Sequence, residues 1–377
     1  MTPDRKSSMR RILILYNALT VGGAERSLAL LVPGLRERGF EPFVATLRQK
    51  GRYFDELRSA GIPTAFVDMR SRWDMRGGLR AYRLARLRPD VVLTQSIDAD
   101  VLGQAIASRR GVPHVIVEQG GVGIRRGLHR TLLARLVTPR VEGVVAVSRS
   151  QIPDLLRLGY REDRIRVIPN GVANHDPSRT RAEVREELGL EPSDVVVALV
   201  ACLRPEKRAD VFIDAVTLAR RSDRRIHGLV VGGGTEFAEI ERRARAAGDG
   251  VQLLGERPDV ANLMLAADAV CLSSDVEGLP LAVVEAMSLA KPVIATDVGG
   301  LRDAVVSGRT GWLVPRRDPD TYASALLELA ADVPRARRMG EEGKRLFEKR
   351  FTAEAMTDRY AEMLSELANE PRGSRLH

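Results

Sequence analysis

The sequence predicts an α/β protein built from two Rossmann-like domains, each with a parallel sheet. Short apolar runs alternate with helical patterns along almost the whole chain, which is typical of strands joined by right-handed crossover helices. A polar stretch at 173–193 interrupts this alternation, which restarts with the apolar run at 195–201. The chain of 377 residues is also longer than a single core usually grows. We therefore expect two cores facing each other across a cleft.

The first domain is expected over residues 11–172, after a flexible tail at 1–10. Its apolar runs predict strands at 11–16, 43–47, 64–67, 91–94, 114–117, 144–147 and 164–168. Gly22 and Gly23 follow the first strand and precede a helix. A glycine loop there would let the backbone approach a ligand closely, although a plain tight turn would have the same residues.

A basic amphipathic pattern lies at 123–140, where five arginines surround four leucines. As a helix, this segment could lie on an anionic bilayer. Core-facing leucines on an ordinary solvated helix would produce the same pattern, so both interpretations stay open.

The polar stretch at 173–193 is interpreted as a linker with one short helix, and the second domain is expected over 194–350. Its strands are predicted at 195–201, 226–231, 251–254, 269–272 and 293–295. An amphipathic helix over 351–368 ends the chain. Ligands bind outside the carboxyl ends of strands in open parallel sheets. The loops that follow these strands should therefore share one rim of the second sheet: 202–208, 232–235, 255–258 and 273–280.

The stretch from 270 to 318 contains the strongest candidate site. Glu277 and Glu285 flank a loop that opens a helix, and Pro280 stands near the first helical position. The free amides of such a helix end bind phosphate, and a carboxylate on each side could accept hydrogen bonds from sugar hydroxyls. This arrangement suits a sugar nucleotide. Surface glutamates around an ordinary strand, loop and helix would match the spacing equally well.

Positive charge is expected beside this site at Lys207 and Arg204. The chain has only six lysines against 53 arginines, so Lys207 in a loop after a strand stands out. An ammonium and a guanidinium there could stabilise a departing phosphate. The alternative is a solvated helix start.

Charge is distributed unevenly along the chain. Residues 1–172 hold 30 Lys and Arg against 16 Asp and Glu, whereas the remainder holds 29 against 34. A basic first half suggests an anionic partner, such as a membrane surface, a phosphorylated lipid or nucleic acid. An arginine-rich genome composition would also produce the excess. Aromatic residues make up only 4% of the chain, which argues against nucleic acid because no stacking platform is visible.

Cysteine usage and hydropathy favour a cytoplasmic location. Cys202 and Cys271 each end an apolar run, as buried thiols do in a reducing compartment, and neither has the spacing of a metal site. No apolar run approaches 18 residues, and the first ten residues have no apolar segment of a secretory signal. We expect a cytoplasmic protein, with peripheral contact at the inner face of an anionic membrane.

Several motifs together resemble the retaining glycosyltransferases of family 4, or glycosyl transferases group 1. They are GGAE at 22–25, VSRS at 147–150, IPNGV at 168–172, LRPEK at 203–207 and SSDVEGLPLAVVEAMSLAKPVIATDVGG at 273–300. The resemblance covers nearly the whole chain. It implies the two-domain GT-B fold, with the final helix crossing back to the first domain.

The resemblance also implies roles for residues. Glu277 with the backbone of Gly278 and Leu279 would hold the donor sugar, and Glu285 would hold the ribose hydroxyls. The amides of Leu281 and Ala282, after Pro280, would meet the diphosphate, while Lys207 and Arg204 would stabilise the leaving group. Further donor contacts would come from Arg257, which lines the base, from the Gly233 loop, and from Gly22 and Gly23.

Three departures from the family pattern affect these expectations. Ala173 stands where the family usually has an aspartate after Asn-Gly-Val. Cys202 stands where the family usually has an arginine, so that either Arg204 replaces its charge or the positive charge of the site is reduced. Glu118 and Gln119 stand where a histidine often follows the fifth strand of the first domain. These two residues are the candidates for the acceptor side, although they do not match the family motif.

By resemblance, we expect a metal-independent retaining hexosyltransferase without a cofactor. It would move a sugar from a UDP- or GDP-sugar to a lipid-linked or polysaccharide acceptor in cell-envelope or exopolysaccharide synthesis. Two alternatives stay open. Cys202 would suit a non-catalytic scaffold that binds a sugar nucleotide, and the same fold also supports sugar-phosphate synthase chemistry.

Overall fold

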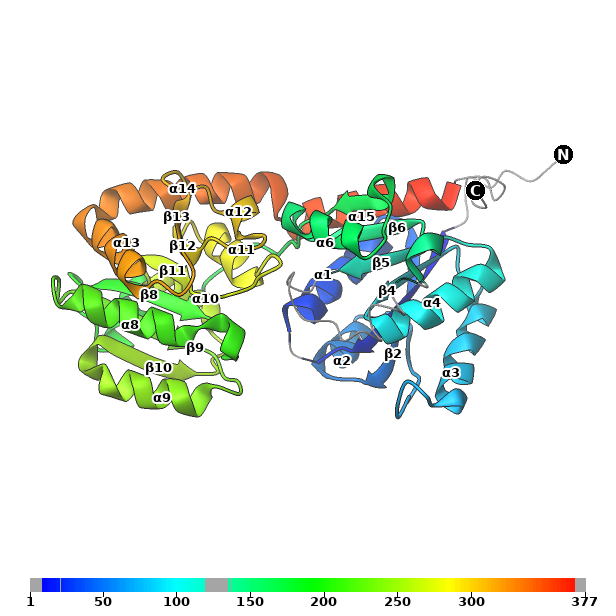
Figure 1. Ribbon diagram of the computed structural model, residues 1–377, viewed down its shortest axis with the longest axis horizontal. Helices are drawn as coiled ribbons and strands as arrows, with labels where there is room; N and C mark the ends of the chain where they lie inside the picture. Colours follow the sequence, from blue (N-terminus) through cyan, green and yellow to red (C-terminus); the bar gives the residue numbers. More distant parts are fainter. Residues whose placement is uncertain (1–8, 21, 119–134, 136, 370–377) are drawn as a thin grey trace. The chain divides into compact units, whose positions relative to one another are not determined.

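A computed structural model describes residues 9–20, 22–118, 135 and 137–369 of the protein. The chain divides into two compact units (Figure 1). Unit 1 consists of Met1–Gly171 and Ala353–His377, and unit 2 consists of Val172–Thr352. Arg10, assigned above to a flexible tail, instead begins the first strand of unit 1.

Unit 1 contains a parallel sheet of seven strands in the order β3-β2-β1-β4-β5-β6-β7. The strands are β1 (Arg10–Ala18), β2 (Phe40–Gln49), β3 (Thr64–Phe66), β4 (Val91–Gln95), β5 (His114–Glu118), β6 (Gly143–Ala146) and β7 (Ile165–Val167). Because β1 pairs with both β2 and β4, the direction of winding reverses between β1 and β4. This reversal is the topological switch point of a doubly wound sheet.

Helices cover both faces of the unit 1 sheet. On one face lie α1 (Gly23–Glu37), α2 (Arg52–Ser59) and α15 (Ala353–Asn369), whose apolar residues share a core with β1 and β4. On the other face lie α3 (Met75–Tyr82), the 3-10 turn Arg83–Leu87 and α4 (Ile97–Arg110). A short helix, α6 (Ile152–Arg157), follows β6. Because α15 packs into the core of unit 1, the final helix belongs to the first domain, as the predicted fold requires.

Unit 2 has a parallel sheet of six strands in the order β10-β9-β8-β11-β12-β13. They are β8 (Val195–Val200), β9 (Ile226–Val231), β10 (Val251–Gly255), β11 (Ala269–Leu272), β12 (Val293–Thr296) and β13 (Gly311–Val314). The edge strand β13 is not among the predicted strands. The fold class of two Rossmann-like domains is confirmed.

The helices of unit 2 are α7 (Arg181–Glu187), α8 (Ala209–Arg220), α9 (Phe237–Ala246), α10 (Val260–Ala266), α11 (Leu281–Ser288), α12 (Leu301–Ala304), α13 (Pro319–Ala331) and α14 (Val333–Arg350). The largest core joins α8 and α13 to the central strands through Phe212 and Tyr322, both fully buried. Cys271 lies in this core, and burial raises the pKa of its thiol to about 12. Cys202 is exposed, contrary to the interpretation of both cysteines as buried thiols.

The segment 173–193, interpreted above as a linker, is packed against unit 2. Val184 is fully buried and Leu190 nearly so, and both lie in small cores with residues of the sheet and α10. The sequence of α7 is highly charged and did not indicate this packing, because one of its buried residues is an arginine. Arg185 is 4% exposed and donates to the backbone oxygen of Ala266 and to Asp268 Oδ2.

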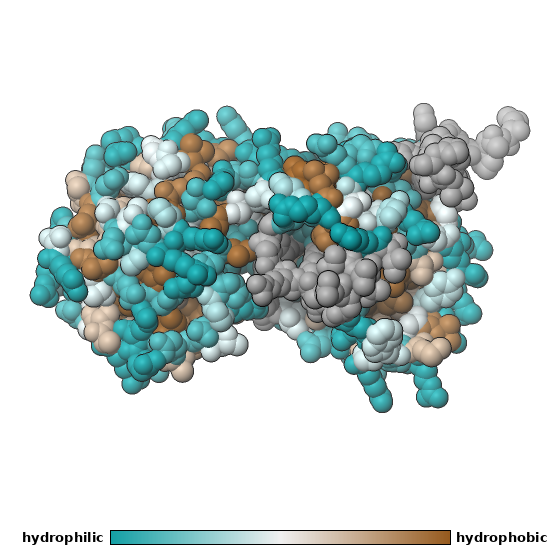
Figure 2. Space-filling view, viewed as in Figure 1, coloured by the Kyte–Doolittle hydropathy of each residue, from teal (hydrophilic) through white to brown (hydrophobic). Residues whose placement is uncertain are grey.

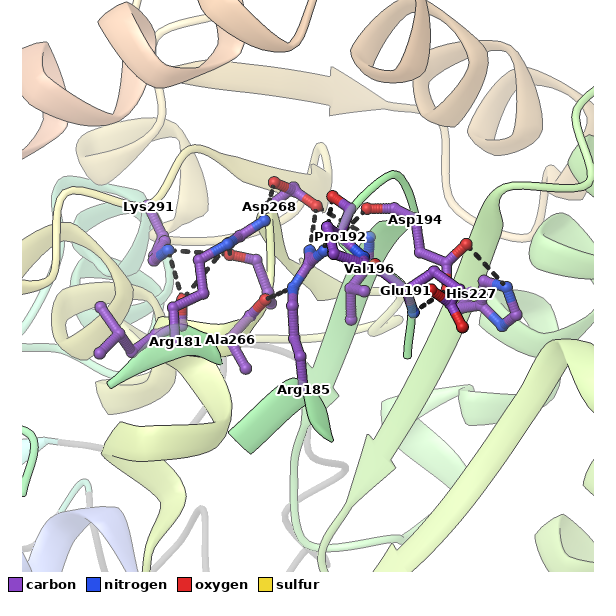
Figure 3. Close-up of polar contacts among 12 residues, drawn as sticks. Arg181, Arg185, Glu191, Pro192, Asp194, Val196, His227, Ala266, Asp268 and Lys291 are labelled. Carbon is purple, nitrogen blue, oxygen red and sulfur yellow. Dashed lines mark hydrogen bonds and ion pairs between the residues drawn. The ribbon is translucent and has the colours of Figure 1, made fainter. Parts of the chain in front are cut away.

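Asp268 is the centre of a charge network that fixes α7 to the sheet (Figure 3). Its carboxylate accepts from Arg181 at 2.6 Å, Arg185 at 2.8 Å and the amide of Val196 at 2.9 Å. Lys291 donates nearby to the backbone oxygens of Leu265 and Ala267. Burial, with Arg181 close by, lowers the pKa of Lys291 to about 8. One buried carboxylate thus offsets several desolvated cations.

Replacing Asp268 with alanine should lower the free energy of unfolding of unit 2 by about 3–5 kcal/mol, because Arg185 would become an uncompensated buried charge. Urea unfolding followed by Trp312 fluorescence, in a Trp73→Phe background, reports on unit 2. Asp249→Ala is the control: its side chain is 86% exposed and pairs with Arg220, and its loss should cost less than about 1 kcal/mol. Equal midpoints for the two variants would contradict the role of Asp268.

Candidate functional site

The candidate site of unit 2 lies where β8 and β11 end side by side. These strands are far apart in sequence but pair in parallel, with Ala269 opposite Val197 and Cys271 opposite Leu199. The loops 201–208 and 273–280 therefore leave the sheet at the same edge. This position is the switch point of the unit 2 sheet, where open α/β sheets bind ligands.

Lys207 and Glu277 form an ion pair between these two loops. Lys207 Nζ lies 2.7 Å from Glu277 Oε1, and Ser274 Oγ donates to the same oxygen at 2.6 Å. The Glu277 side chain is 6% exposed and that of Lys207 21%. Among the described residues both contacts are made to Oε1, which leaves Oε2 to accept hydrogen bonds from a ligand.

Hydrogen bonds between the two loops hold this pair in place. Ser273 Oγ donates to the backbone oxygens of Lys207 and Arg208, at 3.1 and 2.7 Å. The amide of Asp275 donates to the backbone oxygen of Glu206 at 2.8 Å. Thr296 Oγ1, at the end of β12, donates to the oxygen of Ser274 at 2.6 Å. The two serines directly follow a strand, and this position was the signal by which sequence reasoning could have found them.

A second contact supports the loop from β12. Gly299 has φ +51°, and a Cβ there would lie 1.8 Å from the backbone oxygen of Glu277. The amide of Gly300 donates to that same oxygen at 3.4 Å. The position therefore needs glycine both for its backbone conformation and for this close approach.

Helix α11 begins at this rim with free amides. Its N-cap is Pro280, and no side chain caps it. Leu279 and Leu281 are buried, at 4% and 8% exposure, so their side chains anchor the loop. The amide of Val283 donates to the backbone oxygen of Pro280, which leaves the amides of Leu281 and Ala282 without a backbone partner in the described residues. The partial positive charge of such a helix end favours an anion.

Glu285 lies one turn further along α11 and is 5% exposed. His175 Nε2 is 3.9 Å from Glu285 Oε1, and its other ring nitrogen lies 3.1 Å from Ser288 Oγ. His175 comes from the segment interpreted as a linker, 110 positions earlier in the chain. Nothing in the sequence signalled its place beside Glu285.

The remaining donor-side residues are arranged differently. Arg204 is exposed and makes no ion pair within the described part of the chain. Arg257 is held by Asp259 at 2.7 Å and by Glu187 at 3.1 Å, and these hydrogen bonds raise its pKa. Its guanidinium is therefore tied to α7, and its backbone is what remains to contact a base. At Gly233, a Cβ would lie 2.7 Å from Glu256 Oε1.

Asp275 carries a separate set of charges on the same loop. Arg317 donates to both of its oxygens, at 2.7 to 3.1 Å, and lowers its pKa. Arg208 Nη1 lies 3.7 Å from the same carboxylate and pairs with Asp210 at 2.7 Å. These arginines are paired with carboxylates, as Lys207 is with Glu277, whereas Arg204 has no ion pair within the described part of the chain.

Unit 1 has its own polar edge at the carboxyl ends of its strands. Gly22 caps α1 and Gly23 begins it, and Glu118 ends β5, where its backbone oxygen accepts from Gln151. Gln119 and most of the basic pattern at 123–140 lie outside the described residues. Side-chain atoms without hydrogen-bond partners are buried at this edge: Asn17 Oδ1, Thr46 Oγ1, Gln95 Oε1 and Ser96 Oγ.

Ser96 is also strained, with φ +93° and ψ +146° at the N-cap of α4. Non-glycine residues rarely adopt this conformation, which costs about 1–3 kcal/mol and is found mainly at functional sites. Tyr16 is opposite both Thr46 and Gln95 in the register of adjacent strands, so these polar groups lie in one row.

Among the residues that the structure describes, no group of three His, Cys, Asp or Glu side chains is placed to hold a metal. No helix of the described ranges is long and apolar enough to cross a membrane.

Two family models match the chain. Glycosyltransferase Family 4 matches residues 21–175, and glycosyl transferases group 1 matches residues 180–346. Among curated relatives, the D-inositol 3-phosphate glycosyltransferase of Nocardia farcinica is 34% identical over 225 residues, 56% of this chain and 50% of that protein. The chain thus matches about half the length of this relative.

Two further relatives extend over more of the chain. The Escherichia coli UDP-Gal:alpha-D-GlcNAc-diphosphoundecaprenol alpha-1,3-galactosyltransferase is 26% identical over 300 residues, 74% of this chain and 76% of that protein. The solved structure of Anabaena Alr3699/HepE in complex with UDP-glucose superimposes with a TM-score of 0.84 at 23% identity, and covers 95% of this chain and 100% of that one.

Gly299→Ala should displace the backbone at Glu277 and destabilise unit 2. A matched control is Gly308→Ala, because Gly308 also has positive φ (+76°) but nothing within 4 Å of an added Cβ. The control should cost about 1–2 kcal/mol from backbone strain alone, and Gly299→Ala about 1–3 kcal/mol more. Urea unfolding of both variants measures the difference. Equal losses in the free energy of unfolding would show that the close approach of Gly299 to Glu277 does not require a glycine.

Proposed function

Because the chain belongs to the family 4, group 1 glycosyltransferases with the GT-B fold, we propose that it is a retaining hexosyltransferase. It moves a sugar from a UDP- or GDP-sugar to a lipid-linked or polysaccharide acceptor in cell-envelope or exopolysaccharide synthesis. The observation that carries the proposal is the partly buried Lys207–Glu277 pair beside the uncapped N-terminus of α11.

On the donor side, the arrangement suits the two ends of a sugar nucleotide. The diphosphate would accept from the first amides of α11, at Leu281 and Ala282, and from Lys207 and Arg204. Glu277 Oε2 and the backbone at Gly278 and Leu279 would take hydroxyls of the sugar. Glu285, one turn away along α11, would take hydroxyls of the ribose.

In the proposed reaction, the bond between the anomeric carbon and the diphosphate oxygen breaks, and its electron pair leaves with the nucleotide diphosphate. The acceptor hydroxyl bonds to the anomeric carbon on the same face, and its proton passes to the departing phosphate oxygen. Lys207 and Arg204 offset the charge that develops on this oxygen, a role proposed to need neither a metal nor a cofactor. Glu277 positions the donor and holds the Lys207 ammonium; it transfers no proton.

The acceptor is proposed to bind at the polar edge of unit 1. The buried oxygens of Asn17 and Gln95 have no donors among the described residues, and a hydroxyl-rich acceptor would supply them. Glu118 ends a strand at the same edge, and its role as an acceptor-side residue stays a proposal. A cytoplasmic enzyme in peripheral contact with the inner face of the membrane would meet a lipid-linked acceptor there.

The second candidate function is transfer to a soluble phosphorylated acceptor. It is favoured by the relative named D-inositol 3-phosphate glycosyltransferase, which has the higher identity over a shorter match. Assays with an inositol phosphate and with a diphospholipid-linked sugar, read by product mass, separate the two. A scaffold that only binds the donor, the alternative that exposed Cys202 suggests, would bind nucleotide but form no product with either acceptor.

Calorimetric titration with UDP and GDP tests the donor site. We expect one nucleotide diphosphate to bind, and Glu285→Ala to weaken it by about tenfold, the loss of one charge-assisted hydrogen bond. Glu341→Ala, an exposed change on α14, is the control and should bind like the parent. Absence of binding by both nucleotides, with Glu285→Ala indistinguishable from the parent, would overturn the proposal.

Lys207→Ala should reduce kcat by about 10²-fold with a smaller rise in the apparent KM for the donor, because its charge acts most strongly on the departing phosphate. Steady-state kinetics with the identified donor measure both constants. The exposed residue Lys344 provides the matched control, Lys344→Ala. A rise in KM with unchanged kcat would assign Lys207 to ground-state binding alone.

A further inference from the structure

The start of α3 exposes an unusual set of apolar side chains. Trp73 is 84% exposed, Met75 87% and Leu79 52%. Met75 and Leu79 are four residues apart and so lie on one face of the helix. Single exposed apolar residues are common on proteins, but a tryptophan, a methionine and a leucine gathered at one helix end mark an interaction site.

The local structure holds these side chains out of the core. Asp74 caps α3 by accepting from the amides of Gly77 at 2.9 Å and Arg70 at 3.1 Å. Arg80 donates to the backbone oxygens of Val67 and Asp68, at 2.7 and 2.6 Å, which fixes the turn before the helix. A residue in the position of Trp73 usually packs on the fourth helical residue, but that residue is Gly78. Trp73 therefore has no partner within its own helix.

The segment that carries these residues is strongly basic in sequence, with Asp68 and Asp90 beyond its two ends. Residues 69–88 contain seven arginines and one acidic residue, Asp74. Arg70, Arg76 and Arg83 are exposed, and within the described ranges none of the three forms an ion pair. Figure 1 shows α3 beside α4 within unit 1, and apolar residues lie among hydrophilic ones on this part of the surface in Figure 2.

We propose that this α3 surface, formed by Trp73, Met75 and Leu79 with Arg70, Arg76 and Arg83, binds an anionic lipid bilayer. The three apolar side chains enter the boundary between headgroups and acyl chains, where tryptophan is favoured, and the arginines contact anionic headgroups. Insertion and charge together give the two signals that stable membrane binding needs. Nucleic acid would use the arginines but gives no reason to expose Met75 and Leu79.

This inference identifies the residues of the proposed peripheral membrane contact. Its biological role rests on the proposed function, but bilayer binding itself is measurable without any sugar transfer. It identifies the surface that would deliver the enzyme to a lipid-linked acceptor. This surface shares no residue with the basic pattern at 123–140, so the two segments can be varied separately.

Co-sedimentation of the full chain with vesicles tests the proposal. The parent should bind vesicles containing 30 mol% phosphatidylglycerol, a chosen probe composition, and bind pure phosphatidylcholine at least about tenfold more weakly. Trp73→Ser with Leu79→Ser, and separately Arg76→Glu with Arg83→Glu, should each lower binding to anionic vesicles by about tenfold or more. Val306→Ser and Arg224→Glu, exposed positions on unit 2, are the matched controls and should bind like the parent.

Tryptophan fluorescence gives a second readout, because the chain has only two tryptophans. Trp312 is 7% exposed and donates to Glu328, so Trp312→Phe leaves Trp73 as the reporter. Its emission should shift to the blue on anionic vesicles and be quenched by brominated acyl chains. If Trp312→Phe does not fold, quenching in the parent compared with Trp73→Phe gives the same information.

Parent-like vesicle binding by the double variants, or a Trp73 emission unchanged by anionic vesicles, would overturn the proposal. A preference for DNA over vesicles that depends on the same residues would also overturn it. Nucleotide titration of the same variants distinguishes this outcome from failure of the proposed function: the variants should bind UDP or GDP like the parent. Vesicle binding by a chain that binds no nucleotide would leave this inference standing and remove the transferase proposal.

Discussion

The parallel pairing of β8 with β11 is the constraint on which the candidate site depends. These strands are separated by two complete strand–helix units, yet their carboxyl ends meet because the winding of the sheet reverses between them. A cation from one loop and a carboxylate from the other are thereby brought to 2.7 Å. Neither loop alone would form this ion pair, since Lys207 comes from one loop and Glu277 from the other.

The cost of placing these charges near the protein interior explains the surrounding hydrogen bonds. A carboxylate with 6% of its side chain exposed loses most of its hydration. Lys207 and Ser274 replace it at one oxygen, and the serine and threonine bonds to the loop backbone keep the geometry. Binding groups held in this way need little rearrangement when a ligand arrives, which favours affinity and rate.

Two sets of buried polar groups differ in whether the protein itself satisfies them. In unit 2, Asp268 accepts from two arginines and a backbone amide, so that the network is satisfied within the protein. At the edge of unit 1, several buried oxygens lack partners in the described structure, and Ser96 keeps a strained backbone. Satisfied networks stabilise a fold, whereas unsatisfied groups cost free energy that a ligand can recover. This contrast supports a structural role for the first set and a binding role for the second.

The sequence by itself determined the fold class, most strand positions and the donor motif, because buried strands and glycine-rich loops have recognisable local patterns of residues. It did not place His175 beside Glu285, show Val184 and Arg185 of α7 packed into unit 2, or show Trp73 exposed on a fixed turn. Each of these depends on what lies across from a residue, and local periodicity carries no information about that. The same limit applies to Cys202 and Cys271, which both end apolar runs although only the second is buried. Only the tertiary structure decides which of two similar positions faces the core, because strand order and helix packing set the neighbours of every side chain.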